Sequence, residues 1–160
     1  MKKIFAFIAS ALMLASCNES KLQNSTECFD ADKTITDVMM SRRSIRVWKD
    51  STISRETMDE ILKCGINAPN GRNTQSYEIR VLSSAMIDSF TAAVVKDNPQ
   101  VAEKGGFKNI FVNAPHVICL AYDTSYDMAQ VDCGLLGENI ILSAWSMGIG
   151  SCCLGSSARM

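Results

Sequence analysis

The longest helical segment predicted from this sequence has almost no polar face. The segment runs from Asp127 to Met147, and between Leu135 and Trp145 it is apolar on nearly all sides. A helix of that kind is stable in water only where other elements cover it, whereas a surface helix carries a polar stripe. Gly148 then ends the segment, because glycine is favoured just after a helix. We therefore expect this helix to be the buried centre of the domain.

The remaining segments are shorter and of mixed type. Thr34 with Asp37 three residues later is typical of a helix start, and Ser54 marks another, since both hydroxyls can accept from free backbone N–H groups. Apolar periodicity predicts helices from about 34 to 42, 54 to 68 and 84 to 95, and strands over 77–82, 117–121 and 149–154. This order predicts an α+β fold, in which a small central sheet is flanked by helices around the long buried helix.

Size and charge limit the functional classes. The chain has 160 residues, of which 47% are hydrophobic, and a formal net charge of -1, which suits one globular domain. A near-neutral chain lacks the basic surface that broad nucleic-acid binding requires, so we expect no nucleic-acid partner. Neither GxGxxG nor GxxxxGK[ST] occurs in the sequence. Dinucleotide binding by the Rossmann motif and nucleotide binding by a P-loop are therefore not predicted.

The N-terminal residues have the composition of an export signal. Two lysines precede an apolar run that ends at Leu14, too short for a membrane-spanning helix, which needs about 20 apolar residues. Leu14-Ala15-Ser16-Cys17 resembles the lipobox of bacterial lipoproteins. We expect residues 1–16 to be a lipoprotein signal peptide, Cys17 to be the lipidated residue and residues 17–31 to be a polar tether. This predicts a cell-envelope protein held at a bacterial membrane by its lipid anchor. An ordinary secretory signal, or a hydrophobic helix docked on the core, is the alternative.

Cysteine and histidine usage argues against a metal site. Once Cys17 is set aside, six cysteines remain, with no CxxC pair. The adjacent Cys152 and Cys153 leave a thiol redox function as an alternative, although neighbouring cysteines rarely reach disulfide geometry. His116 is the sole histidine and begins an apolar strand, which favours a structural role. A multi-histidine metal site and a histidine-based hydrolytic triad are not predicted.

Three segments could instead hold a ligand. The first is the basic segment Arg42-Arg43-Ser44-Ile45-Arg46, whose guanidinium groups suit phosphate, although such a cluster can also be a solvated face. The second is the loop from Ala68 to Tyr77, rich in amides and hydroxyls that could bind a planar heterocycle or simply form a turn. The third is Gly148 to Ser156, where small residues allow close approach of a flat ligand or merely end a helix.

Taken in order, these motifs resemble the nitroreductase family. RRSIR is followed by APNGRNTQSY, then by Asp132-Cys133-Gly134 with Glu138-Asn139, and finally by GIGSCCLGS, over roughly residues 34 to 157. The resemblance implies a domain over residues 32–160 that binds FMN at a homodimer interface. Family members usually continue with a further strand and a tail around the partner subunit. Only four residues follow Ser156 here, so we expect the C-terminal part of the domain to be missing.

The same resemblance implies the residues of the flavin site. The phosphate and ribityl end would contact Arg42, Arg43, Ser44 and Arg46, and the isoalloxazine ring would lie beside Leu154, Gly155 and Ser156. A loop reaching the flavin from the partner subunit would bring Pro69, Asn70 and Asn73, although this chain has Asn70 where serine is usual and Ser76-Tyr77 where Pro-Trp is usual.

The function implied by the resemblance is a two-electron transfer. An FMN-dependent oxidoreductase would take electrons from a donor, typically NAD(P)H, and reduce nitroaromatic, quinone or similar flat oxidants. The cofactor carries that chemistry, so no side chain is assigned as general acid or base and no metal is expected. A non-catalytic lipoprotein that binds flavin or another phosphorylated ligand is the alternative.

Overall fold

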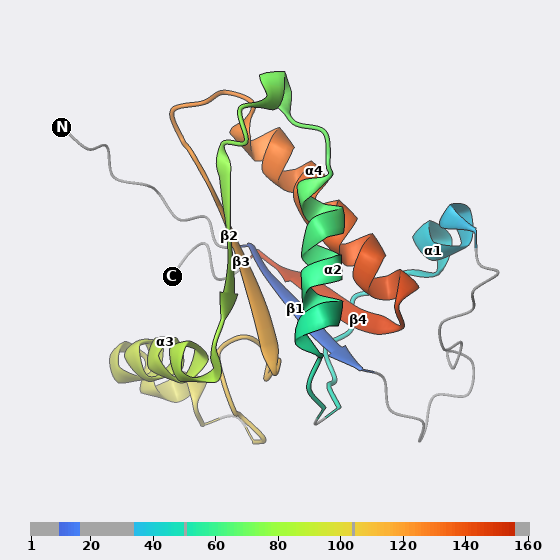
Figure 1. Cartoon of the computed structure of the whole chain (residues 1–160). Coiled ribbons are helices and arrows are strands. Elements are labelled where there is room, and N and C mark those ends of the chain that lie inside the picture. Colours follow the sequence, from blue (N-terminus) through green and yellow to red (C-terminus); the bar gives the residue numbers. More distant parts are fainter. Residues whose placement is uncertain (1–9, 17–33, 50, 104, 156–160) are drawn as a thin grey trace.

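The computed structural model describes residues 10–16, 34–49, 51–103 and 105–155 (Figure 1). Its sheet has four antiparallel strands in the order β2-β3-β1-β4. The strands are β1 (Ser10–Ser16), β2 (Tyr77–Leu82), β3 (His116–Tyr122) and β4 (Ile149–Leu154). The helices are α1 (Ile35–Ser41), α2 (Arg55–Ile66), α3 (Ser84–Asp97) and α4 (Ala129–Ser146), with short 3-10 turns η1 (Gly71–Asn73) and η2 (Pro99–Val101). The predicted α+β class is confirmed.

The helix starts lie where the sequence predicts them. The Asp37 N–H donates to Thr34 Oγ1 at 3.2 Å, and the Thr34 N–H donates back to Asp37 Oδ2 at 2.9 Å, which is a complete capping box. At α2, the Thr57 N–H donates to Ser54 Oγ at 3.1 Å. Local polar residues therefore mark where these two helices begin.

The core lies mainly between the helices α2 and α4 and the sheet (Figure 1). Ile61, Leu136 and Ile140 are fully buried there. The two helices approach closely at Gly65, where an added Cβ would lie 2.5 Å from Ile140 Cγ1. A second, smaller cluster includes Val117, and alternate residues of β3 belong to the two clusters. Strand β3 is thus covered on both faces, as expected for a continuous apolar run of strand length.

One side of α4 departs from the sequence prediction. The helix is central, as expected, and it packs against α2 and the sheet. Its opposite side, however, leaves Met128, Val131 and Leu135 exposed by 46%, 52% and 41%. These residues follow helical spacing and form an apolar surface along α4, which we call the α4 stripe. The near absence of a polar face is therefore explained only in part by the core of one chain.

Residues 10–16, predicted as the end of a signal peptide, form a strand of this sheet. Leu12 is in register with Ile118 of β3 on one side and with Cys153 of β4 on the other. Cys17 and the predicted tether lie outside the described ranges, so export, cleavage and lipidation remain predictions. Within the described ranges, no helix combines the length and the apolar character needed to cross a membrane.

Candidate functional site

The basic segment that follows α1 runs along β4. The Ile45 N–H donates to the Ser151 carbonyl oxygen at 2.9 Å, and Ser44 forms a parallel bridge with Ser151. Gly150 makes this approach possible, because an added Cβ would lie 2.7 Å from Ile45 Cγ1. The structure therefore brings the first predicted segment against the third, at an outer strand of the sheet.

Two tryptophans hold this segment from either side. The Trp145 Nε1–H of α4 donates to Ser41 Oγ at 2.9 Å, just before the arginines begin. The Trp48 Nε1–H donates to the Val112 carbonyl oxygen at 2.7 Å, just after they end. With Ile45 half-buried between them, the backbone of the segment is fixed. The arginine and serine side chains of the segment therefore extend from a fixed backbone.

The three arginines differ in what they contact. Arg43 donates from Nη1 to the Met40 carbonyl oxygen at 2.9 Å and to the Arg42 carbonyl oxygen at 2.8 Å, so it caps the end of α1. Arg42 is half-buried and Arg46 exposed, and among the described residues neither forms an ion pair. Two guanidinium groups are therefore available to an anion.

Beside these arginines lies a polar atom without a hydrogen-bond partner. The Ser151 hydroxyl is buried, and no described residue donates to it or accepts from it. Its neighbour Ser44 is exposed and presents a second hydroxyl. A set of two guanidinium groups without a described ion-pair partner and a serine hydroxyl fits a phosphate group, which needs several strong donors. The residues present are thus compatible with the phosphate end of FMN.

The amide-rich loop forms a tight turn at η1. Asn70 Oδ1 accepts from the Gln75 N–H at 3.0 Å, and the Thr74 N–H donates to the Gly71 carbonyl oxygen at 3.1 Å. Pro69 and Asn73 are exposed. Of the predicted loop residues, Asn70 therefore shapes the turn through its side chain. The side chain of Asn73 forms no described hydrogen bond, and its backbone N–H donates to the Asn70 carbonyl oxygen.

The position predicted for the ring lies at the end of β4. Leu154 is buried, whereas Gly155 is exposed, and no atom of the described residues lies within 4 Å of a Cβ added there. Ser156 lies outside the described ranges. The preceding Cys152 is buried and Cys153 exposed, as expected for neighbours on opposite faces of a strand. Burial, followed by the nearby Cys152 and Glu138, raises the pKa of the Cys153 thiol, which opposes the thiol redox alternative.

The loop and the basic segment are anchored at opposite ends of α4. Ser41 contacts Trp145 in the last turn of that helix, whereas Gly71 donates to Asp132 in its first turn. Thirteen residues of helix separate these anchors, a distance of about 20 Å. Figure 1 shows the loop above the upper end of α2, far from α1. Within one chain, therefore, the basic segment lies against β4, but the amide-rich loop does not reach either of them.

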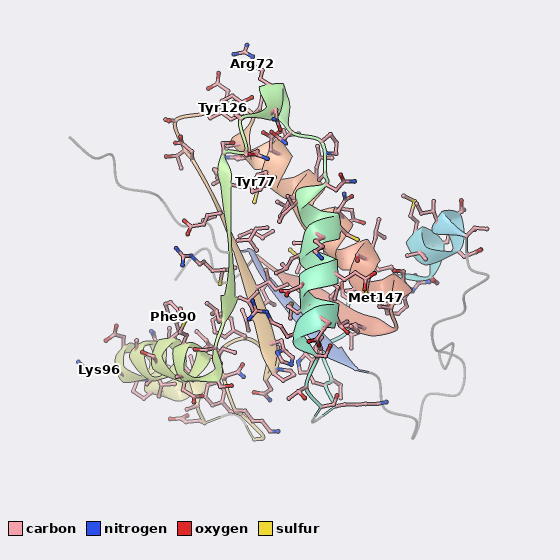
Figure 2. The ribbon with its side chains drawn as sticks, viewed as in Figure 1. Arg72, Tyr77, Phe90, Lys96, Tyr126 and Met147 are labelled. Atoms are coloured by element: carbon pink, nitrogen blue, oxygen red, sulfur yellow. The ribbon has the colours of Figure 1, made fainter. Side chains whose placement is uncertain are left out.

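Two residues that place the loop were not predicted from the sequence. Asp132 is buried and accepts from the Gly71 N–H at 2.9 Å. Tyr126 closes against the same glycine, since an added Cβ would lie 2.3 Å from its hydroxyl. Figure 2 shows Tyr126 beneath Arg72 at the tip of the loop. A carboxylate in the first turn of a largely apolar helix was the available signal, but its partner lies 61 residues away.

His116 has the structural role that the sequence favours. Its Nε2 atom accepts from the Ile53 N–H at 3.0 Å, which ties β3 to the segment before α2. Burial lowers the pKa of the imidazole, so the neutral form that can accept this bond is favoured. Within the described ranges, no group of three or more histidine, cysteine, aspartate or glutamate side chains could hold a metal ion.

Comparison with known proteins identifies the family of this chain. The model of the Nitroreductase family matches residues 39–160. A protein of Archaeoglobus fulgidus named "Putative NADH dehydrogenase/NAD(P)H nitroreductase" is 33% identical over 130 residues, which are 76% of this chain and 67% of that protein.

Two solved structures share both sequence and fold with the chain. An FMN-dependent nitroreductase of Clostridium difficile R20291 is 33% identical with a TM-score of 0.63, over 76% of this chain and 60% of the other. A nitroreductase with bound FMN from Desulfitobacterium hafniense DCB-2 is 30% identical with a TM-score of 0.60, over 71% and 65%. The chain thus spans 60% to 67% of the length of these three relatives. On this evidence the chain belongs to the nitroreductase family.

Proposed function

We propose that this protein is an FMN-dependent oxidoreductase. It takes two electrons from NAD(P)H and passes them to nitroaromatic compounds, quinones or similar flat oxidants. The observation that carries the proposal is the basic segment fixed beside β4, where Arg42 and Arg46 have no carboxylate partner among the described residues. The names of the relatives support it, because the Clostridium difficile protein is FMN-dependent and the Desulfitobacterium hafniense protein was solved with FMN bound.

In this proposal the residues of the chain hold the cofactor and leave its ring accessible. Arg42, Arg46 and Ser44 donate to the phosphate, while Arg43 keeps the end of α1 in place. Leu154 and Gly155 lie along the ring, with Gly155 leaving room for a flat substrate. The flavin, when bound, supplies the acceptor for a hydride or two electrons. The protein needs no metal ion for such a transfer.

The site is completed by a second copy of the chain. Within one chain the Pro69–Asn73 loop is anchored at the far end of α4 from the start of the basic segment. A homodimer brings the loop of one copy to the basic segment of the other. The α4 stripe of Met128, Val131 and Leu135 offers an apolar surface on which the two copies can meet. We assign Pro69, Asn70 and Asn73 to the flavin site of the partner subunit.

Turnover by the full chain tests the proposal. Cell-free synthesis without membranes yields the chain with its N-terminus intact, and FMN is added before gel filtration. Under anaerobic conditions NADPH or NADH should bleach the flavin absorbance, and one equivalent of a quinone or a nitroaromatic compound should restore it. A protein that retains FMN but is bleached by neither donor supports the alternative, a flavin-binding protein without turnover. A protein that emerges colourless contradicts both.

The cell-envelope location is a separate proposal. It rests on the Leu14-Ala15-Ser16-Cys17 sequence and the short apolar run before it. The chain expressed in bacteria fed with labelled palmitate should become labelled and sediment with membranes, and Cys17→Ser should abolish both. Label in the Cys17→Ser chain, or an unlabelled and soluble wild-type chain, contradicts the anchor.

A further inference from the structure

A hydrogen bond between distant parts of the chain holds the amide-rich loop at η1. Asp132 Oδ1 accepts from the Gly71 N–H at 2.9 Å, although 61 residues separate the two in sequence. Asp132 lies in the first turn of α4 and is only 2% exposed. The aspartate therefore joins the body of the domain directly to the backbone of the loop.

The second oxygen of the Asp132 carboxylate forms no described hydrogen bond that would stabilise the core. Asp132 Oδ2 is buried, and no described residue donates a hydrogen bond to it. Burying an acceptor without a donor is unfavourable, so such a group persists where it has another role. The start of an 18-residue helix reduces the penalty, because the N–H groups there favour negative charge. What the carboxylate contributes is its bond to Gly71.

The loop needs to be held from outside because its backbone is strained. Arg72, Asn73 and Gln75 have φ angles of 54°, 55° and 49°, in the left-handed region that side chains disfavour. Bonds from Gln75 to Asn70 and from Thr74 to Gly71 close the turn upon itself. Neither of these two bonds connects the turn to α4. The bond to Asp132 fixes where the turn lies relative to α4.

Tyr126 lies against the same glycine. An added Cβ at Gly71 would lie 2.3 Å from the Tyr126 hydroxyl and 3.4 Å from Met128 Cβ. Gly71 is thus enclosed between the aspartate and the residues that precede α4. Met128 also belongs to the α4 stripe, so the loop is fixed close to the surface proposed for dimerisation.

We propose that Asp132 is a positioning residue for the flavin site. By holding the Gly71 N–H, it sets the approach of Asn70 and Asn73 to the flavin bound by the partner subunit. The inference rests on the proposed function, since it assigns a task within that site. Loss of the bond leaves the loop to sample other positions, and its ordering must then be supplied by flavin binding, which weakens affinity.

Hydrogen exchange of the flavin-free full chain tests the contact itself. In Asp132→Ala, amides of residues 70–76 should exchange about 10-fold faster or more, while those of β3 stay at the wild-type rate. Asp132→Asn keeps an oxygen that can accept from Gly71 and should restore slow exchange. Ser143→Ala is the matched control, because it removes a buried polar group of α4 that has no described partner. Exchange in the loop of that control should match wild type.

Flavin titration of the same variants tests the assigned task. Asp132→Ala should bind FMN about 10-fold more weakly or worse, Asp132→Asn should remain within about threefold of wild type, and all should stay dimeric in sedimentation. Unchanged loop exchange in Asp132→Ala overturns the inference, as does a rise shared equally with β3, which reports general destabilisation. Faster loop exchange with unchanged FMN affinity overturns it as well. A wild-type chain that binds no FMN instead contradicts the proposed function, while the exchange result still decides whether Asp132 holds the loop.

Discussion

Ser44 and Ser151 form a parallel bridge, and the backbone bond from Ile45 to Ser151 beside it places the basic segment against β4. Two stretches separated by more than a hundred residues are thereby combined into one surface. The arginines gain a fixed position from this contact rather than from their own side-chain bonds. Disturbing the bridge should therefore affect ligand binding as well as stability.

Gly150→Ala should displace the basic segment. The new Cβ would lie 2.7 Å from Ile45 Cγ1, so the two backbones must separate. We expect the free energy of unfolding in urea to fall by about 1–3 kcal/mol, as for other overpacked sites. FMN affinity should fall with it. Gly134→Ala is the control, because no atom of the described residues lies within 4 Å of its added Cβ and alanine favours helix. Equal stability of the two variants would show that the close approach does not matter.

Arg42→Ala and Arg46→Ala should distinguish two flavins. Each removes a charged donor from the proposed phosphate site, a contact of about 1.5–3 kcal/mol, so FMN should bind roughly 10- to 100-fold more weakly. Riboflavin lacks the phosphate and should bind nearly as before. Arg55→Ala, on the surface of α2 and paired with Asp59 at 3.2 Å, should leave both affinities unchanged. An equal loss of affinity for FMN and riboflavin would show that the arginines do not contact the phosphate.

Leu135→Lys should weaken the dimer. The residue lies in the α4 stripe, and a lysine there introduces a charge into an apolar contact. We expect the dimer dissociation constant in analytical ultracentrifugation to rise about 10-fold or more, with loss of FMN as a consequence. Phe90→Lys makes the same kind of change on α3, where Phe90 is half-exposed and lies far from α4 (Figure 2). A dimer that is weakened by Phe90→Lys and not by Leu135→Lys would show that the interface lies at α3 and not at the α4 stripe.

His116 should make stability depend on pH. Burial lowers the pKa of the folded imidazole from the ordinary value of 6.5, so below that value the unfolded chain binds the extra proton more readily. The contribution is fully present above pH 6.5 and is lost as the pH falls toward the folded pKa. Urea midpoints measured across this range should decline more for the wild type than for His116→Gln, which cannot titrate. Identical declines in the two chains would assign the effect to other groups.

A chain that begins at residue 17 should be less stable than the full chain. Removing residues 1–16 deletes β1, whose backbone is paired with both β3 and β4. Each lost backbone bond contributes about 0.5–1.5 kcal/mol net, so the free energy of unfolding should fall by several kcal/mol. Urea unfolding of both chains measures the difference. Equal midpoints would mean that the strand adds nothing to the sheet.

Local sequence signals predicted most of the elements and part of the site. Thr34, Ser54 and Gly148 marked helix ends through capping chemistry, which depends on near neighbours alone. The strand at 10–16 was missed because a short apolar run suits a signal peptide and a buried strand equally. The tie between Asp132 and Gly71, and the capping role of Arg43, depend on how the chain folds back on itself. No local pattern encodes them.

Co-sedimentation shows whether the full chain binds FMN as a dimer. The chain is mixed with excess FMN and centrifuged while flavin absorbance and protein absorbance are followed separately. The flavin should travel with a dimer, at one FMN for each chain, and free riboflavin should compete poorly for it. Flavin absorbance that stays with the slow free species, while the protein sediments without it, would contradict the assignment of this chain as an FMN-dependent enzyme.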